Sequence, residues 1–319
     1  MRREPTPDPT LPDRHAPLVA RNPQDIAAAV PVALGFEPDD SVVMLTIGGR
    51  DGFHARVDFP PAAAADDEVI DLLMAPALTH EVEAVLFVHY AADARAVRRL
   101  ARRLEREFRA ARVRVIVQLR VTDQRCYAAL GRLPGVTAHG LPLDVRSHAF
   151  RAASVLHGRV TLGSRAEVAA TVAPDVPSQR AVEALPMPIP CTAPGLRLRL
   201  CELLSDETTV RLDDAEVARM AHSLVDPRIR DEALLLVSRD TADRHVALWS
   251  DVVRRAPEHL VPDVAAVLAL AAWVAGHGAL AWCAVERCRE VAPDHRLAGY
   301  VAAALENALP PRVWDERVG

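Results

Sequence analysis

The feature that most constrains the fold is a proline-dense stretch near the middle of the chain. Between residues 174 and 194 the sequence contains six prolines. Proline fixes its own φ and donates no backbone N–H, so neither a long helix nor a central strand can run through this stretch. We therefore divide the 319 residues into a disordered Pro-rich arm (1–20), an α/β domain (21–173), a Pro-rich connection (174–195) and a helical domain (196–315).

The amino-terminal domain alternates between two kinds of pattern. Runs rich in β-branched residues predict strands, and runs whose apolar residues lie three and four apart predict helices. Their order indicates an α/β domain, a mixed sheet with packed helices. The predicted elements are a helix at 23–33, a hairpin of strands at 41–48 and 53–59, a helix at 66–80, a strand at 83–90, a helix at 93–111, a strand at 113–121, and helices at 146–157 and 164–174.

The carboxy-terminal domain is predicted to be all helical. Its clearest part is a helix over 263–275, a Gly-His-Gly turn, a second helix over 279–291 and a third over 295–308. Small residues at Ala269, Ala281 and Cys288, followed by Pro293, fall where a tetratricopeptide-type repeat needs them. We therefore expect a tetratricopeptide-like helical array.

One segment of this domain has the length of a transmembrane helix, because Val264 to Val285 contains no charged residue. Nine of its residues are alanine, and the Gly-His-Gly turn interrupts it near the middle. These features favour a helical hairpin packed in a soluble core, so we predict no membrane association.

Several stretches together resemble a known family. They are "DIAAAVPVALGFEPDDSVVML", "RVDFP", "LHGRVTLGSRAEVAATVAP", "LWSDVVRRAPEHLVPDVAAVLALAAWVAGHGALAWCAVERC" and "ALPPRVW". Over residues 20 to 315 the chain resembles an uncharacterised actinobacterial family, domain of unknown function 4192. The resemblance implies no established activity, substrate or catalytic residue. Many members carry a Cys-rich insertion after the position of Arg125, where this chain has only Cys126, so the resemblance gives no metal site here.

Composition excludes several classes of chemistry. The chain contains no lysine, which rules out Schiff-base catalysis and a phosphate-loop lysine. Its five cysteines form no Cys-x-x-Cys pair, and no nucleotide-binding or zinc-hydrolase motif is present, so we predict no cofactor and no metal. The charged, Pro-rich amino terminus lacks the apolar region of a signal peptide, and we expect a cytoplasmic protein.

The loop "LGFEPDDS" is the first candidate site. Asp39, Asp40 and Ser41 would stand at the entrance of a strand and could face a cleft. Each residue also has a local structural use, because Gly35 can end the preceding helix and the Asp side chains can bond free backbone amides. The structural interpretation is favoured, since no histidine stands at a fixed offset to activate Ser41 and no nucleophile elbow is present.

The second candidate site is a set of polar residues at or just beyond predicted strand ends, where α/β sheets commonly bind ligands. Two arginines and two carboxylates there could bind an anionic small molecule and supply acid or base chemistry. They could equally be salt-bridged strand ends, the favoured interpretation, although this remains the best enzyme-like site. The set comprises Asp58, His89, Arg120, Asp123 and Arg125.

The third feature is an arginine-rich helix, with nine arginines between Arg95 and Arg114. The arginines lie off the apolar stripe and could bind nucleic-acid phosphates. Glu105 and Glu107 interrupt the run, no aromatic residue is interleaved for base stacking, and the chain has a net charge of −5. A solvated helix face is therefore favoured, and a nucleic-acid partner is not expected.

Tryptophans mark the fourth candidate. Trp249, Trp273 and Trp282 lie in the helical domain and would either pack in its core or line a concave groove for a peptide. His277, at the predicted hairpin tip, is expected to be exposed rather than a ligand.

We favour a binding or adaptor protein that presents a helical groove to a protein partner. An enzyme or sensor for an anionic small molecule at the strand ends is the alternative, followed by nucleic-acid binding.

Overall fold

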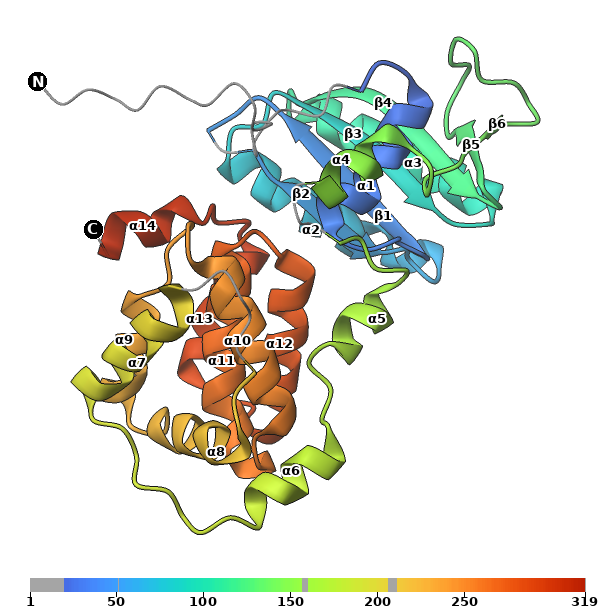
Figure 1. Cartoon of the computed structure of the whole chain (residues 1–319). Coiled ribbons are helices and arrows are strands. Elements are labelled where there is room, and N and C mark those ends of the chain that lie inside the picture. The colour runs from blue at the N-terminus through green and yellow to red at the C-terminus, as the bar shows by residue number, and fades with distance from the viewer. Residues whose placement is uncertain (1–19, 51, 157–159, 206–210, 319) are drawn as a thin grey trace, which may run out of the picture.

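The computed structural model of the chain describes residues 20–50, 52–156, 160–205 and 211–318. The disordered arm expected over residues 1–20 lies outside the described residues, apart from Ala20. The described chain forms an α/β region and a helical region, as the sequence predicts, with the two regions side by side (Figure 1).

A six-stranded mixed sheet forms the centre of the α/β region. Its strand order is β2-β1-β3-β4-β5-β6. Only β3 and β4 run parallel, and the other neighbours are antiparallel, including the predicted β1–β2 hairpin. The strands are β1 (Ser41–Ile47), β2 (His54–Asp58), β3 (Ala84–Tyr90), β4 (Arg114–Thr122), β5 (Arg125–Ala128) and β6 (Leu141–Pro142).

Helices cover both faces of this sheet. On one face α2 (Asp66–Thr79) and α3 (Ala94–Ala110) bury an apolar cluster with Val42, Met44 and Phe87. On the other face α1 (Pro23–Leu34) packs over Val43, Val88 and Leu119, with α4 (Ala149–Leu156) beside it. A short 3₁₀ turn, η1 (Ala63–Ala65), leads into α2. Strand alternation therefore sends odd and even side chains into two separate cores.

Local sequence signals account for the helix ends. The Asn22 side chain accepts a hydrogen bond from the Asp25 amide at the start of α1, and Asp93 accepts from Arg95 and Ala96 at the start of α3. Gly35 ends α1 at φ 80°, a left-handed conformation that glycine adopts without a Cβ penalty. The predicted Ser164 cap opens α5 (Arg165–Ala170).

The helical region contains seven further α-helices around a central one. α11 is buried at every residue except Asp263, and it contacts α8, α9, α10, α12 and α13. Such a helix is apolar all round because it forms the core of the region. The helices are α7 (Ala193–Ser205), α8 (Asp214–Ser223), α9 (Pro227–Leu235), α10 (Ala242–Arg255), α11 (Val261–Val274), α12 (Gly278–Val291), α13 (Arg296–Glu306) and α14 (Arg312–Val318), with a 3₁₀ turn η2 (Glu258–Leu260).

The uncharged segment Val264–Val285 divides into α11 and α12 at Gly276, whose φ is 80°. The two helices form the most extensive helix–helix contact of the described chain, as the predicted hairpin requires. The small residues Ala269, Ala281 and Cys288 are all fully buried. Among the described residues, no helix is long and apolar enough to cross a membrane.

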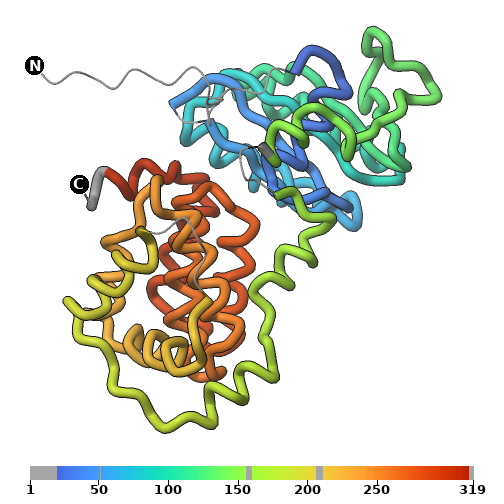
Figure 2. Tube along the Cα trace, viewed as in Figure 1, coloured from blue at the N-terminus to red at the C-terminus, as the bar shows by residue number. Residues whose placement is uncertain are grey.

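The Pro-rich connection is partly helical and is attached to the helical region. Within it α6 (Val176–Glu183) packs against α8 and α10, and the Asp175 amide donates to the Arg254 carbonyl at 2.8 Å. Pro177 lies in the first turn of α6, where a missing N–H is harmless. The Cα trace shows this stretch running along the side of the helical bundle before it enters α7 (Figure 2).

The two regions meet at the loop that follows α1. Phe36 is 2% exposed and belongs to the same apolar cluster as Val168, Val172 and the helical core. Backbone bonds fix the loop to the chain before α5, because Leu162 donates to Gly35 and Glu37 donates to Leu162, both at 2.9 Å. A second contact joins the regions where the His80 ring lies 2.9 Å from the Asn307 carbonyl.

Candidate functional site

The predicted strand-end residues lie at one end of the sheet. In the strand register Asp58 pairs with Ser41, Ser41 with Tyr90, and Tyr90 with Val121. β2 and β4 are nevertheless separated by β1 and β3, which places their ends about 14 Å apart at ordinary strand spacing. Among the described residues, no hydrogen bond or ion pair joins any two of Asp58, His89, Arg120, Asp123 and Arg125.

Asp58 and Arg120 each have a local contact instead. The Asp58 carboxylate, 83% exposed on the edge strand, pairs with Arg56 at 2.5 Å. The Arg120 guanidinium donates to the Ala92 carbonyl at 3.2 Å and stacks 4.2 Å from the centre of the Tyr127 ring. This stacking is a cation–π contact between the neighbouring strands β4 and β5, and it stabilises the sheet. The guanidinium thus already contacts both a carbonyl and an aromatic ring of this chain.

His89 is fully buried beneath α3. Its Nε2 lies 3.1 Å from Gln118 Oε1, and the Gln118 amide donates to the Ala101 carbonyl of α3 at 2.8 Å. Burial lowers the pKa of His89 to about 4, although the hydrogen bond that its ring donates to Gln118 raises it. Its Nδ1 has no partner among the described residues. His89 is therefore a neutral core group at pH 7, with no path to a ligand at the surface.

Asp123 and Arg125 form the turn between β4 and β5. Asp123 is exposed and has a φ of 50°, as does the neighbouring Gln124 at 54°. The Arg125 guanidinium donates to the His139 and Gly140 carbonyls at 2.6 and 3.1 Å, so it holds the loop before β6. Four of the five predicted residues thus have separate structural contacts, and Asp123 lies exposed in the turn.

The "LGFEPDDS" loop has a structural use at each position. Asp39 Oδ1 accepts from the Asp40 amide at 3.0 Å, and the Asp40 carbonyl accepts from Phe59 at 2.8 Å. Asp40 itself has a φ of 37°, a turn conformation that Asp tolerates. Ser41 is fully buried as the first residue of β1, and its Oγ has no partner among the described residues. This loop builds the joint between the two regions.

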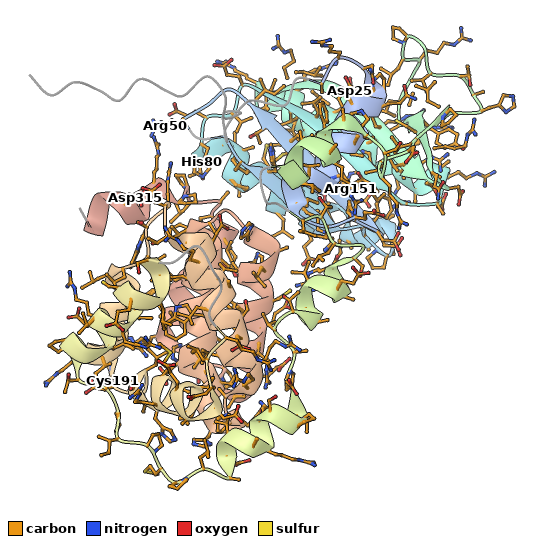
Figure 3. The ribbon with its side chains drawn as sticks, viewed as in Figure 1. Asp25, Arg50, His80, Arg151, Cys191 and Asp315 are labelled. Carbon is orange, nitrogen blue, oxygen red and sulfur yellow. The ribbon has the colours of Figure 1, made fainter. Side chains whose placement is uncertain are left out.

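An ion pair strengthens the same joint. The Glu37 carboxylate accepts from Arg151 of α4 at 2.7 Å, and Arg151 also donates to the Thr161 carbonyl at 2.9 Å. Arg151 lies beneath the sheet and above α5 in the side-chain view (Figure 3). The sequence did not predict this pair, because the two residues are 114 positions apart and only the fold brings them together.

The tryptophans of the helical region are packing residues. Trp249 is fully buried on α10, where its indole N–H donates to His245 at 3.1 Å. Trp273 is 8% exposed and donates to the Leu309 carbonyl at 3.1 Å. Trp282 packs partly buried against the same core. Trp249 and Trp273 are thus buried and Trp282 is partly buried, as in the packing alternative that the sequence left open. His277 is 35% exposed and lies 2.7 Å from Asp243.

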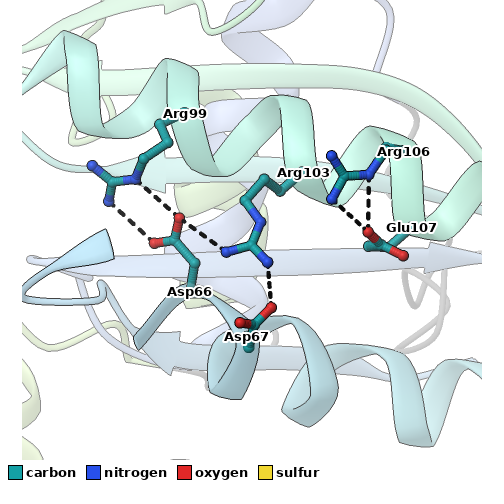
Figure 4. A network of polar contacts seen from close by, with 6 residues as sticks. All are labelled: Asp66, Asp67, Arg99, Arg103, Arg106 and Glu107. Atoms are coloured by element: carbon teal, nitrogen blue, oxygen red, sulfur yellow. Dashed lines mark hydrogen bonds and ion pairs between the residues drawn. The ribbon is translucent and has the colours of Figure 1, made fainter. Parts of the chain in front are cut away.

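Some of the arginines of α3 form ion pairs and others do not. Asp66, fully buried at the first residue of α2, accepts from Arg99 at 2.9 and 3.1 Å, and Arg103 bridges Asp66 and Asp67 (Figure 4). Farther along, Arg106 pairs with Glu107 at 2.7 Å and Arg109 with Glu105 at 2.8 Å. The pairs with Asp66 and Asp67 fasten α2 to α3, whereas the other two pairs lie within α3. Together they account for four of the seven arginines of the helix.

The remaining arginines of α3 form no ion pair among the described residues. Arg95, Arg98 and Arg102 are all exposed. Two shallow hollows open farther along, at the carboxy-terminal half of the helix, and of these three arginines only Arg102 lines one of them. The larger, of about 450 Å³, is lined by Arg102, Glu105, Arg106, Arg109 and Ala110.

An exposed apolar segment lies between α6 and α7, at the end of the molecule away from the sheet (Figure 1). Met187 is 82% exposed and Ile189 is 87% exposed. The segment is attached at both ends, because the Leu185 amide donates to the Val182 carbonyl and the Cys191 amide to Ser223 Oγ at 2.8 Å. We had interpreted this stretch only as a connection. No local pattern of the sequence indicates that its large apolar side chains are exposed.

The described residues include no group of three or more His, Cys, Asp or Glu side chains that could hold a metal ion. The five cysteines are free, and burial raises the pKa of Cys126 to about 11 and of Cys288 to about 12. Neither thiol is a thiolate at pH 7, so neither is activated as a nucleophile.

Comparison with known proteins identifies the family. The profile described as "Domain of unknown function (DUF4192)" matches residues 23–312, which span both regions of the structure. No curated protein and no solved structure matches the chain. The sheet, the joint at Phe36 and the helical bundle are thus all parts of one family domain, and the chain belongs to the DUF4192 family.

Proposed function

We propose that this protein functions by binding another protein, as an adaptor, and that the partner contacts its helical half at residues 185–190. One observation carries the proposal, the exposure of Met187 and Ile189 on a segment with a constrained backbone. Exposed apolar side chains that lie together on a protein surface commonly mark an interaction site.

The sequence of the segment restricts its backbone. Residues 185–190 read Leu-Pro-Met-Pro-Ile-Pro, so every residue is either a proline or precedes one. Proline fixes its own φ near −65°, and the residue before a proline is confined to extended conformations. The segment is therefore extended before any partner arrives, and binding it costs less conformational entropy than ordering a flexible loop.

The chemistry of the segment also indicates a protein partner. Residues 184–196 contain no charged side chain, so an apolar surface can cover them without desolvating a charge. The amides of Met187 and Ile189 have no hydrogen-bond partner among the described residues. In an extended strand these two amides point to the same side, where the edge of a partner's sheet or an aromatic-lined groove can accept them.

In this proposal the partner contacts residues 185–190 and not a groove lined by tryptophans.

A cytoplasmic site of action is part of the proposal. It is supported by the five free cysteines, because disulfides form and persist mainly in oxidising compartments.

The test is capture from the native host with wild-type protein, followed by identification and purification of the recovered partner. With the purified partner, Met187→Ser plus Ile189→Ser should weaken binding about 10- to 100-fold, because two large apolar side chains are no longer buried. Leu198→Ser is the matched control, since Leu198 is 65% exposed on α7 outside the segment. Equal affinities for the double variant and the control would reject the segment as the contact.

A further inference from the structure

The arginines of α3 divide into two classes that the sequence could not separate. Arg99 and Arg103 neutralise Asp66 and Asp67, and their positions follow from the packing of α2 on α3. Three other arginines in the first half of the helix form no ion pair among the described residues. Arg95, Arg98 and Arg102 point away from the buried stripe of Val97, Leu100 and Ala101.

These three side chains form a line along the helix. Positions i, i+3 and i+7 lie on one helix face, so the three guanidiniums follow each other along the axis. With a rise of 1.5 Å per residue, the distance from Arg95 to Arg102 along the axis is about 10 Å. Four successive phosphates on one strand of a duplex also span about 10 Å along its axis, because three intervals of 3.4 Å separate them. The line of positive charge therefore has the length of a four-phosphate stretch.

The residues around these three arginines favour a duplex over a single-stranded nucleic acid. Single strands are bound mainly by aromatic side chains on which bases stack. The only aromatic residue of α3 is Phe108, which is buried against Phe87. A line of guanidiniums without a stacking platform suits the outside of a duplex, where planar N–H forks bind phosphate oxygens.

The positive charge of α3 differs in sign from the net charge of the whole chain. α3 carries seven arginines and two glutamates, whereas the chain has a net charge of −5. The positive potential is therefore local, and a polyanion that approaches from another side is repelled. We infer that the exposed face of α3 is a sequence-independent binding site for duplex nucleic acid, with Arg95, Arg98 and Arg102 contacting three phosphates within a stretch of four.

The experiment is titration of a fluorescent 20-base-pair DNA duplex with the full-length protein, followed by anisotropy at several salt concentrations. Three phosphate contacts give a slope of log affinity against log salt of about −3, so affinity falls about 40-fold between 50 and 200 mM salt. Arg98→Glu plus Arg102→Glu leaves one contact, and we expect the duplex to be released at 50 mM salt. Neither side chain has a structural partner, so a melting curve should confirm that this variant is folded.

Arg50→Glu plus Arg197→Glu is the matched control. These arginines are 66% and 58% exposed, lie away from α3, and their reversal changes the net charge by the same amount. The inference requires that this control bind as the wild type does. Equal loss in both double variants, a salt slope near zero, or tighter binding of single-stranded DNA or polyglutamate than of the duplex would each overturn it. The site is separate from residues 185–190, so either proposal can fail without the other.

Discussion

The two regions of the molecule bury their central helices in opposite ways. In the α/β region α3 carries all its charge on one side and presents five buried apolar residues to the sheet on the other. In the helical region α11 is buried all round and carries one charged residue, Asp263. A one-sided helix leaves an outer face for a partner, whereas a central helix has none. Surface chemistry in the helical region must therefore come from its periphery.

Each region nevertheless buries a carboxylate and neutralises it from a neighbouring helix. Asp66 is held by Arg99 and Arg103, and Asp263 lies 2.5 Å from Arg230 and 3.2 Å from His295. Burial alone would raise the pKa of Asp263, but the hydrogen bonds from His295 and Arg230 bring it below its usual value. Each carboxylate thus joins the helix that carries it to a neighbouring helix.

The largest predicted effect tests whether the helical tryptophans are core residues. Trp249→Ala should lower the free energy of unfolding by about 3–5 kcal/mol, because it removes a fully buried ring from the bundle. Urea denaturation of the wild type and the variant measures this loss. Tyr300→Ala is the control, since Tyr300 is 64% exposed and should cost under about 0.5 kcal/mol. A loss below 1 kcal/mol for Trp249→Ala would restore the groove interpretation.

The second prediction compares one buried histidine from each region. Burial lowers the pKa of His89 and of His245 to about 4, below the ordinary 6.5. Between pH 4 and 6.5 the unfolded chain therefore binds more protons than the folded chain. The contribution of each neutral histidine to the free energy of unfolding is fully present above pH 6.5 and is lost as the pH drops toward 4. Each histidine should cost on the order of 2–3 kcal/mol at pH 4.5 relative to pH 7.

Unfolding free energies of the wild type, His89→Gln and His245→Gln at pH 7 and 4.5 measure these contributions. Each substitution should remove its own share of the difference between the two pH values, whatever it does to stability at pH 7. A difference that is the same in all three proteins would contradict the assignment of both rings as neutral core groups.

The smallest predicted effect concerns adjacent carboxylates at the start of α2. Asp66→Asn should cost about 1.5–3 kcal/mol, because two arginines lose a buried charged acceptor. Asp67 is 75% exposed, and Asp67→Asn should cost under about 1 kcal/mol. Thermal unfolding of the two variants side by side gives the comparison, and equal shifts in melting temperature would show that burial of Asp66 has no energetic consequence.

Much of the fold could be predicted from local patterns. The caps Asn22 and Ser164, the continuous apolar runs of β1 and β3 and the apolar stripe of α3 are all visible in short stretches of sequence. The structure confirms the elements that they predict. β5 and β6 were missed because they are four and two residues long and lie among turn residues. α6 was missed because its single proline lies in its first turn, where helices accept proline.

The candidate sites were harder to predict because they depend on distant contacts. Sequence spacing placed charged residues at strand ends, but only the strand order shows that β2 and β4 are not neighbours. Likewise, the periodicity of α3 identifies an arginine face without showing which arginines meet Asp66 and Asp67. The exposure of Met187 and Ile189 follows from the path of the chain around the bundle, which no local pattern encodes.

The position of Phe36 has a practical consequence for dividing the molecule. A fragment cut at residue 173 would present Phe36, Val168 and Val172 to water, because their cover comes from helices encoded after the cut. Such a fragment would aggregate or be degraded, and protease nicking near the prolines should leave two pieces that stay associated. Truncation experiments on this family would therefore report on a damaged interface between the two regions and not on the function of each region.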